Sequence, residues 1–170
     1  GHTLPILPNR AVGDASHWRA PTCPSITIRC LGERDALSAV RLAQTYGNPL
    51  RAVGRGHSWS GAADSRDAVR LECAGGMCRV LGIDVASRRV CVQPGIALFE
   101  LRRVLAANGL TLGSWPMLHA QTVGGAVSTG SHGSGRDGTL SDLVVGARLV
   151  MPGPTIRECG ECGVWRDGAR

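Results

Sequence analysis

The chain has 170 residues, of which 43% are hydrophobic and 4% aromatic, and its formal net charge is +6. This length fits one domain of ordinary size, with a core built from aliphatic side chains. All 19 basic residues are Arg, and they are scattered, so the basic run interleaved with aromatics that is typical of nucleic-acid binders is missing. We expect no nucleic-acid partner, and a basic nucleic-acid-binding module is an alternative on charge alone.

Cysteine usage and hydropathy restrict the class of protein further. Seven Cys residues at irregular spacing argue against a disulfide framework and favour free thiols in a reducing intracellular compartment over secretion. Cys159-x-x-Cys162 has the spacing of a zinc knuckle, but no second pair matches it, so we expect no metal. No signal peptide or apolar run of transmembrane length is visible, and the sequence does not indicate membrane association.

The first half of the chain predicts a β-α-β unit. Residues 25–29 alternate polar and apolar side chains, as a half-buried strand does. Residues 33–46 carry apolar side chains at helical spacing, and Gly47 ends this helix. Residues 50–53 form a second short strand, which leads into a glycine-rich loop at 54–61.

The second half predicts a hairpin, a helix and a second glycine-rich segment. In chain order we expect strands at 69–71, 80–85 and 90–93, a helix at 97–108 that ends at Gly109, a glycine-rich stretch at 121–135, and a last strand at 143–150. After Pro152 the sequence, rich in Gly, Pro, Cys and Arg, shows no strand or helix periodicity.

The first glycine-rich loop follows a strand, a context in which backbone N–H groups bind anions. It lacks the Gly-Lys-Ser/Thr ending of a P-loop, and Trp59 stands where the dinucleotide fingerprint needs its third glycine. A tight surface turn is the alternative. His57 lies inside this loop, between Gly56 and Ser58, and is a candidate ligand, base or nucleophile; the alternative is a polar surface residue.

The second glycine-rich segment adds hydroxyl groups suited to phosphate and ribose oxygens. These belong to Thr122, Ser128, Thr129, Ser131 and Ser134. Two such segments, separated by strands and a helix, suit a long, twice-phosphorylated cofactor better than a single phosphate; two unrelated turns are the alternative. His132 is a candidate hydrogen-bond donor to that cofactor.

Both segments together resemble the FAD-binding domain of the vanillyl-alcohol-oxidase superfamily, also called PCMH-type. R-A-V-G-R-G-H-S-W-S at 51–60 is similar to the segment that carries the flavin-linked His in that family. T-V-G-G-A-V-S-T-G-S-H-G-S-G at 122–135 is similar to the segment around the flavin and its pyrophosphate. Together with G-T-L-S-D-L-V at 138–144, this second motif resembles the sequences of the sugar-lactone and alditol oxidases most.

The resemblance implies an α+β fold in which two α+β subdomains clasp FAD. We therefore expect an N-terminal arm at 1–20, the PCMH-type FAD-binding domain at 21–157 and an unassigned tail at 158–170. His57 is the expected covalent flavin site. The expected cofactor-binding residues are Val53, Gly54, Arg55, Gly56, His57, Ser58, Trp59, Gln121, Thr122, Gly124, Gly125, Ser128, Thr129, Gly130, His132 and Gly133.

The implied reaction is oxidation of a hydroxyl-bearing carbon of a sugar lactone or alditol, with hydride transfer to FAD. In the family, a cap domain that follows this region supplies the substrate pocket, and the sequence ends before such a cap. The alternative hypothesis is therefore a truncated or inactive FAD-binding fragment without turnover of its own.

Overall fold

The structure is a computed structural model that describes residues 6–7, 26–58, 60–135 and 138–161. The described chain divides into two compact units. The first contains the residues up to Met77 and those at 150–156, and the second contains 78–149 and the residues from Arg157 onward. Most of the predicted N-terminal arm, Trp59 and the end of the predicted tail lie outside the described residues.

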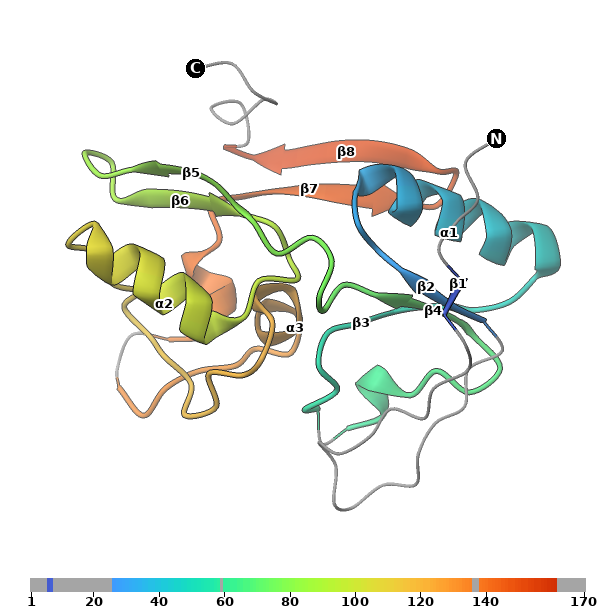
Figure 1. Cartoon of the computed structure of the whole chain (residues 1–170), viewed down its shortest axis with the longest axis horizontal. Coiled ribbons are helices and arrows are strands. Elements are labelled where there is room, and N and C mark those ends of the chain that lie inside the picture. The colour runs from blue at the N-terminus through green and yellow to red at the C-terminus, as the bar shows by residue number, and fades with distance from the viewer. Residues whose placement is uncertain (1–5, 8–25, 59, 136–137, 162–170) are drawn as a thin grey trace. The chain divides into compact units, whose positions relative to one another are not determined.

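A four-stranded sheet forms the centre of the first unit (Figure 1). Its strands are β1 (Ile6–Leu7), β2 (Ile26–Arg29), β4 (Val69–Glu72) and β3 (Leu50–Val53), in that spatial order. β1 runs antiparallel to β2, whereas β2, β4 and β3 are parallel to one another. Helix α1 (Glu33–Tyr46) connects β2 to β3. The predicted β-α-β unit is present, but β4 lies between its two strands.

Helix α1 forms where a stripe of alanines faces the sheet. Ala36, Ala39 and Ala43 are buried and pack with Ile28, Val69 and Leu71 in one core cluster. Asp35 accepts the backbone N–H groups of Leu31 and Gly32 at 2.8 and 3.1 Å, which satisfies donors at the start of the helix. The helix ends at Gly47, whose φ of 68° is the left-handed conformation that glycine adopts most readily.

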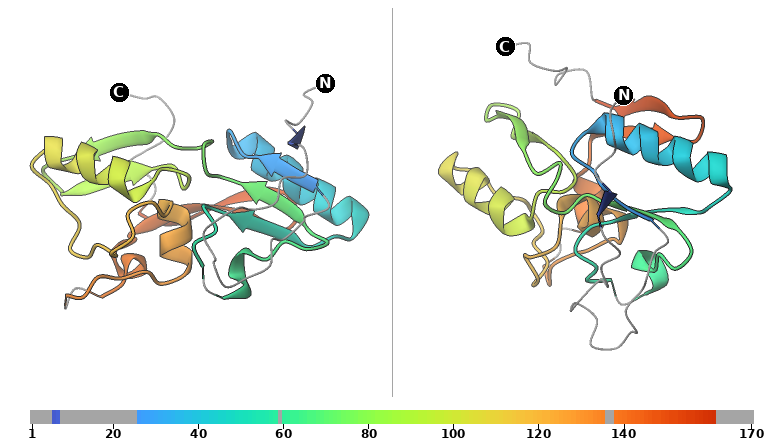
Figure 2. Two further views of the ribbon diagram at one scale, coloured as in Figure 1. Left: turned by 60° about the horizontal axis from the view of Figure 1, so that its bottom comes forward. Right: turned by 45° about the vertical axis from the view of Figure 1, so that its right-hand side comes forward.

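The second unit contains a hairpin and a helix packed beside it (Figure 2). Strands β5 (Val80–Asp84) and β6 (Arg89–Val92) pair antiparallel, as the sequence predicts. Helix α2 (Leu98–Ala107) occupies most of the predicted helix at 97–108. Its buried face and its partners comprise Leu101, Leu105, Ile96, Val80, Val90, Val92, Leu110, Leu112, Trp115 and Val123.

Three local elements differ from the sequence prediction. The second glycine-rich stretch contains a short helix, α3 (Val123–Ser128), where a loop was expected. The last strand, β7 (Gly146–Met151), begins later than predicted because Leu140–Leu143 forms a 3-10 helix capped by Thr139. A further strand, β8 (Thr155–Gly160), pairs with β7 although no strand was predicted after Pro152. Among the described ranges, no helix has the length and apolarity needed to cross a membrane.

Candidate functional site

The first glycine-rich loop starts at the carboxyl end of β3. Val53, the last residue of this strand, is buried, and its carbonyl oxygen accepts the backbone N–H of Cys73 at 3.1 Å. The chain then bends through Gly54 and Arg55, and Gly56 has a φ of 71°, a value that L-residues rarely adopt. The sheet therefore fixes the root of the loop, and glycine permits the reversal that follows.

The backbone of this loop presents unused donors. The N–H groups of Arg55, Gly56, His57 and Ser58 donate no hydrogen bond to another described residue. Consecutive N–H groups of this kind form an anion-binding concavity. The loop ends where the Ser60 hydroxyl accepts the Ala62 N–H at 3.3 Å and caps the 3-10 helix η1 (Gly61–Ala63). Arg55 is exposed and adds positive charge.

His57 is partly buried in this loop, and its pKa lies below the usual range. Burial is the larger cause, because it removes water from the charged imidazolium, and the positive charge of Arg55 adds to the shift. The lowered pKa favours the neutral imidazole. This form has a nitrogen with a free lone pair, which can act as a nucleophile or a base.

In the second segment, the glycines allow backbone to pack against backbone. Thr122 is 2% exposed, and its hydroxyl caps α3 by accepting the Gly125 N–H at 3.3 Å. Gly124 donates its N–H to the Pro94 carbonyl at 2.8 Å. A Cβ added at Gly124 would lie 2.7 Å from the Pro94 Cβ, so only glycine fits against this proline.

Unlike those of the first loop, most backbone N–H groups of the second segment donate hydrogen bonds to other residues of the protein. The donor–acceptor pairs are Gly124 to Pro94, Gly125 to Thr122, Ala126 to Thr122, Thr129 to Gly125, Gly130 to Val127, Ser131 to Ala126 and Gly133 to Ser114. What the segment offers to a ligand is therefore close approach of its backbone and its hydroxyl groups. Ser128 and Thr129 are both exposed, and the Thr129 hydroxyl donates to the Gly125 carbonyl at 2.9 Å.

The end of this segment is held by residues that precede it in the chain. The Gly133 N–H donates to the buried Ser114 hydroxyl at 2.9 Å. A Cβ at Gly133 would lie 2.6 Å from the Trp115 carbonyl oxygen, so this glycine is also required by close packing. The exposed His132 lies beside it, with Nδ1 2.8 Å from the Gly133 carbonyl oxygen.

Gln121 has an unusual hydrogen-bond state. Its Nε2 donates to the Ser131 hydroxyl at 3.4 Å, whereas its Oε1 is buried and has no partner among the described residues. A buried acceptor without a donor is costly, so this oxygen is a position where a ligand N–H or O–H would be stabilising.

The structure thus assigns the predicted site residues to two groups. The first loop, in the first unit, holds those from Val53 to Ser58, and the second segment, in the second unit, holds those from Gln121 to Gly133. Trp59 lies outside the described residues. Sequence reasoning missed Pro94, Ser114 and Trp115, which support the second segment; only the long-range packing identifies them.

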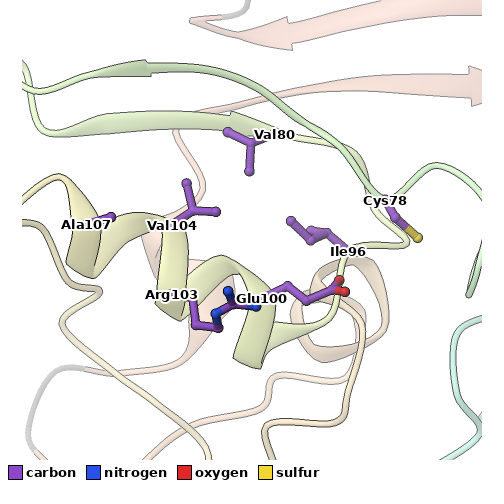
Figure 3. Close-up of a pocket in the computed structure, with 7 residues that line it drawn as sticks. All are labelled: Cys78, Val80, Ile96, Glu100, Arg103, Val104 and Ala107. Carbon is purple, nitrogen blue, oxygen red and sulfur yellow. The ribbon is translucent and has the colours of Figure 1, made fainter.

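A cavity of about 540 Å³ lies elsewhere in the second unit, between α2 and the hairpin (Figure 3). In this view Val80 on β5 points toward Val104 on α2, and Glu100 and Arg103 lie along the helix. Its full lining is Cys78, Val80, Ile96, Glu100, Arg103, Val104 and Ala107. None of the predicted site residues lines it. The described residues also contain no cluster of three or more His, Cys, Asp or Glu side chains arranged for a metal ion.

Comparisons with known proteins bear on both segments. A family model described as "FAD binding domain" matches residues 24–160. The chain is 31% identical over 140 residues to L-gulonolactone oxidase of Bos taurus, which covers 82% of this chain and 31% of that protein. It is 36% identical over 143 residues to mitochondrial L-galactono-1,4-lactone dehydrogenase 1 of Oryza sativa subsp. japonica. This match covers 81% of this chain and 24% of that protein. The chain thus spans a quarter to a third of these relatives.

Solved structures show the same fold. 6-Hydroxy-D-nicotine oxidase from Arthrobacter nicotinovorans superposes with a TM-score of 0.74 at 26% identity, over 87% of this chain and 32% of that one. An alkyldihydroxyacetonephosphate synthase gives a TM-score of 0.72 at 27% identity, over 89% of this chain and 28% of that one. The α+β fold predicted from the sequence and the resemblance drawn from the two motifs are both confirmed.

Proposed function

The chain belongs to the FAD binding domain family, and from this membership we propose that it is the cofactor-binding part of a flavin-dependent oxidoreductase that acts on a sugar lactone or alditol. The family establishes FAD as the cofactor. The lactone substrate class is supported by the names of similar proteins, an L-gulonolactone oxidase and an L-galactono-1,4-lactone dehydrogenase.

The unused N–H groups of the first loop carry this proposal. FAD contains a pyrophosphate, and the donors of Arg55, Gly56, His57 and Ser58 suit a phosphate oxygen. The guanidinium groups of Arg51 and Arg55, both exposed, add favourable charge. A simple surface turn would leave these donors to water, so the loop alone fits either interpretation, and family membership favours the cofactor.

The second segment carries groups of its own that suit a flavin cofactor. Ser128 and Thr129 offer exposed hydroxyls, and the orphaned Gln121 Oε1 lacks a donor, which flavin and ribityl groups supply in abundance. Thr122 and Gly124 also have a structural role, because the Thr122 hydroxyl caps α3 and Gly124 packs closely against Pro94.

His57 is the proposed covalent attachment site. Its lowered pKa keeps the imidazole neutral near pH 7, so a nitrogen lone pair is available. This nitrogen would hold FAD through a covalent bond to the 8-methyl group of the flavin. When bound, FAD would accept a hydride from the substrate carbon. The role of the protein is to hold FAD in position.

The test is to purify the chain with FAD and record flavin absorbance after removal of free FAD. We expect a flavin spectrum, and after acid precipitation mass spectrometry should find flavin on the tryptic peptide containing His57. The His57→Ala variant should bind FAD without a covalent bond, and His119→Ala is the matched control because His119 is not among the expected cofactor-binding residues. A colourless protein with no FAD signal in calorimetry would contradict the proposal.

Turnover requires a separate assay on the full-length protein. We expect reduction of the flavin by an aldonolactone or an alditol under anaerobic conditions, followed by reoxidation when an acceptor is added. Firm FAD binding without reduction by any such substrate would favour the alternative of an FAD-binding fragment without turnover.

A further inference from the structure

Two cysteines meet at the ends of neighbouring strands in the first unit. The pairing of β2 with β4 ends with Arg29 opposite Glu72, so the next residues, Cys30 and Cys73, lie side by side. The Cys30 N–H continues the ladder by donating to the Glu72 carbonyl at 2.8 Å. Neighbouring strands lie about 4.8 Å apart, which is within the Cα separation of about 4.4–6.8 Å that a disulfide spans.

The side chains of this pair interact. Cys30 belongs to the core cluster of the first unit, and Cys73 packs against that cluster. Cys30 is 1% exposed, and its Sγ also lies 3.3 Å from the Sδ of Met77 and 3.4 Å from the Gly32 carbonyl oxygen. Cys73 is only partly buried, and both thiols are free. A buried cysteine therefore lies beside a partly buried one.

The two thiols differ in acidity. Hydrogen bonding to Cys73 and burial raise the pKa of Cys30, whereas the hydrogen bond received from Cys30 lowers the pKa of Cys73. Redox-sensitive cysteines combine thiolate character and exposure with a neighbouring thiol that resolves the first oxidation product. Cys73 fits the first role and Cys30 the second.

We propose that Cys30 and Cys73 form a redox-active dithiol that a hydroperoxide oxidises to a disulfide between the ends of β2 and β4. The Cys73 thiolate attacks the peroxide oxygen, the O–O bond breaks, and Cys73 becomes a sulfenic acid while hydroxide leaves and is protonated to water. The Cys30 sulfur then attacks the Cys73 sulfur, the S–O bond breaks, and the proton of the Cys30 thiol joins the departing hydroxide, which leaves as a second water. Two thiols are oxidised, and one hydrogen peroxide is reduced.

The position of Cys73 links this chemistry to the first loop. Its backbone N–H holds the carbonyl oxygen of Val53, the residue from which the glycine-rich loop departs. Closing a disulfide brings the two sulfurs to about 2.05 Å, so the side chains must turn toward each other although the strand separation already suits the bond. We expect this rearrangement at Cys73 to disturb the Val53 contact and to weaken FAD binding at the loop. This consequence rests on the proposed function, whereas formation of the disulfide does not.

The experiment treats the reduced protein with hydrogen peroxide, alkylates remaining thiols and digests with trypsin. Cleavage after Arg gives a peptide of residues 30–34 and another of residues 71–79. We expect these two peptides to be joined, with a loss of about two thiols per chain, and severalfold weaker FAD binding that a reductant reverses. The second peptide also contains Cys78, so fragmentation must place the link at Cys73.

Matched variants separate the pair from other thiols. Cys73→Ser should abolish the linked peptides, and Cys78→Ser should retain them, because the Cys78 thiol donates to the Gly95 carbonyl and takes no part in the pair. Cys30→Ser repeats the test from the buried partner if it folds. Linked peptides in Cys73→Ser, a link to Cys78, or sulfinic acid on Cys73 as the end product would each overturn the proposal. FAD binding by the reduced protein without any linked peptide would overturn this inference alone.

Discussion

The backbone N–H of Gly133 donates a 2.9 Å hydrogen bond to the hydroxyl of Ser114, which lies 19 residues earlier in the chain. Ser114 is only 6% exposed, so water cannot replace it readily as the acceptor. The contact joins the end of the second glycine-rich segment to the segment that precedes it. Ser114 is therefore a positioning residue for the second segment.

We predict that Ser114→Ala weakens FAD binding. The Gly133 N–H loses its acceptor in a buried position, which costs about 1–3 kcal/mol, and the second segment loosens. Thermal unfolding and FAD titration measure the two effects. Ser134→Ala is the matched control for stability, because this exposed serine lies in the same segment and should leave the unfolding temperature near that of the parent protein. Equal FAD affinities in Ser114→Ala and the parent would contradict the positioning role.

A second prediction concerns Gly124. Glycine within a helix ordinarily destabilises it relative to alanine by about 0.5–1 kcal/mol, so propensity alone predicts that Gly124→Ala is stabilising. The added Cβ would lie 2.7 Å from the Pro94 Cβ and 3.1 Å from its carbonyl oxygen. We expect the variant to lose about 1–3 kcal/mol instead, as overpacked cores do. Urea unfolding decides the sign, and a gain in stability would show that α3 moves away from Pro94 at little cost.

The N-cap of α3 offers a third prediction. Thr122→Val keeps a side chain of similar size but removes the oxygen that accepts the Gly125 N–H at 3.3 Å. Loss of an N-cap acceptor costs about 0.5–2 kcal/mol. Thr122→Ser keeps the oxygen and loses one methyl group, so it is the matched control. We expect Val to weaken FAD binding more than Ser does; the reverse order would mean that burial of the Thr122 methyl group matters more than the cap.

Local sequence patterns predicted much of the secondary structure, because they depend on neighbouring residues. The alanine spacing and Gly47 define α1, and the alternation around residues 86–89 defines the hairpin. The insertion of β4 between β2 and β3 is a different matter, since strand order depends on pairing between distant segments. The helix α3 was missed because Gly124 and Gly125 are poor helix formers, and tertiary packing overrides that propensity.

The candidate site was predicted as a set of glycine-rich segments, but not in its division of roles. Composition treats the two segments alike. The structure distinguishes them: among the described residues, the N–H groups of 55–58 in the first loop have no acceptor, whereas most N–H groups of the second segment have one. The supports Pro94 and Ser114 carry no motif, so no signal in the sequence marks them. Strand β8 was missed because five of its six residues are exposed, which leaves no alternation to recognise.

The last prediction concerns the pH dependence of stability in the apo-protein, and it follows from His57. Its pKa in the folded chain lies below the value of about 6.5 expected when it is unfolded. As the pH falls through that value, the unfolded chain takes up a proton before the folded chain does, so the free energy of unfolding decreases. His57→Gln removes this proton uptake.

Urea unfolding at about pH 7.5 and pH 5.5 should therefore show a larger loss of stability in the parent protein than in the His57→Gln variant. Arg55→Gln removes the repelling charge and should give an intermediate loss, since burial, the larger cause of the shift, remains. Equal losses in the parent protein and His57→Gln would contradict a lowered pKa at His57, and with it the neutral imidazole on which the proposed attachment depends.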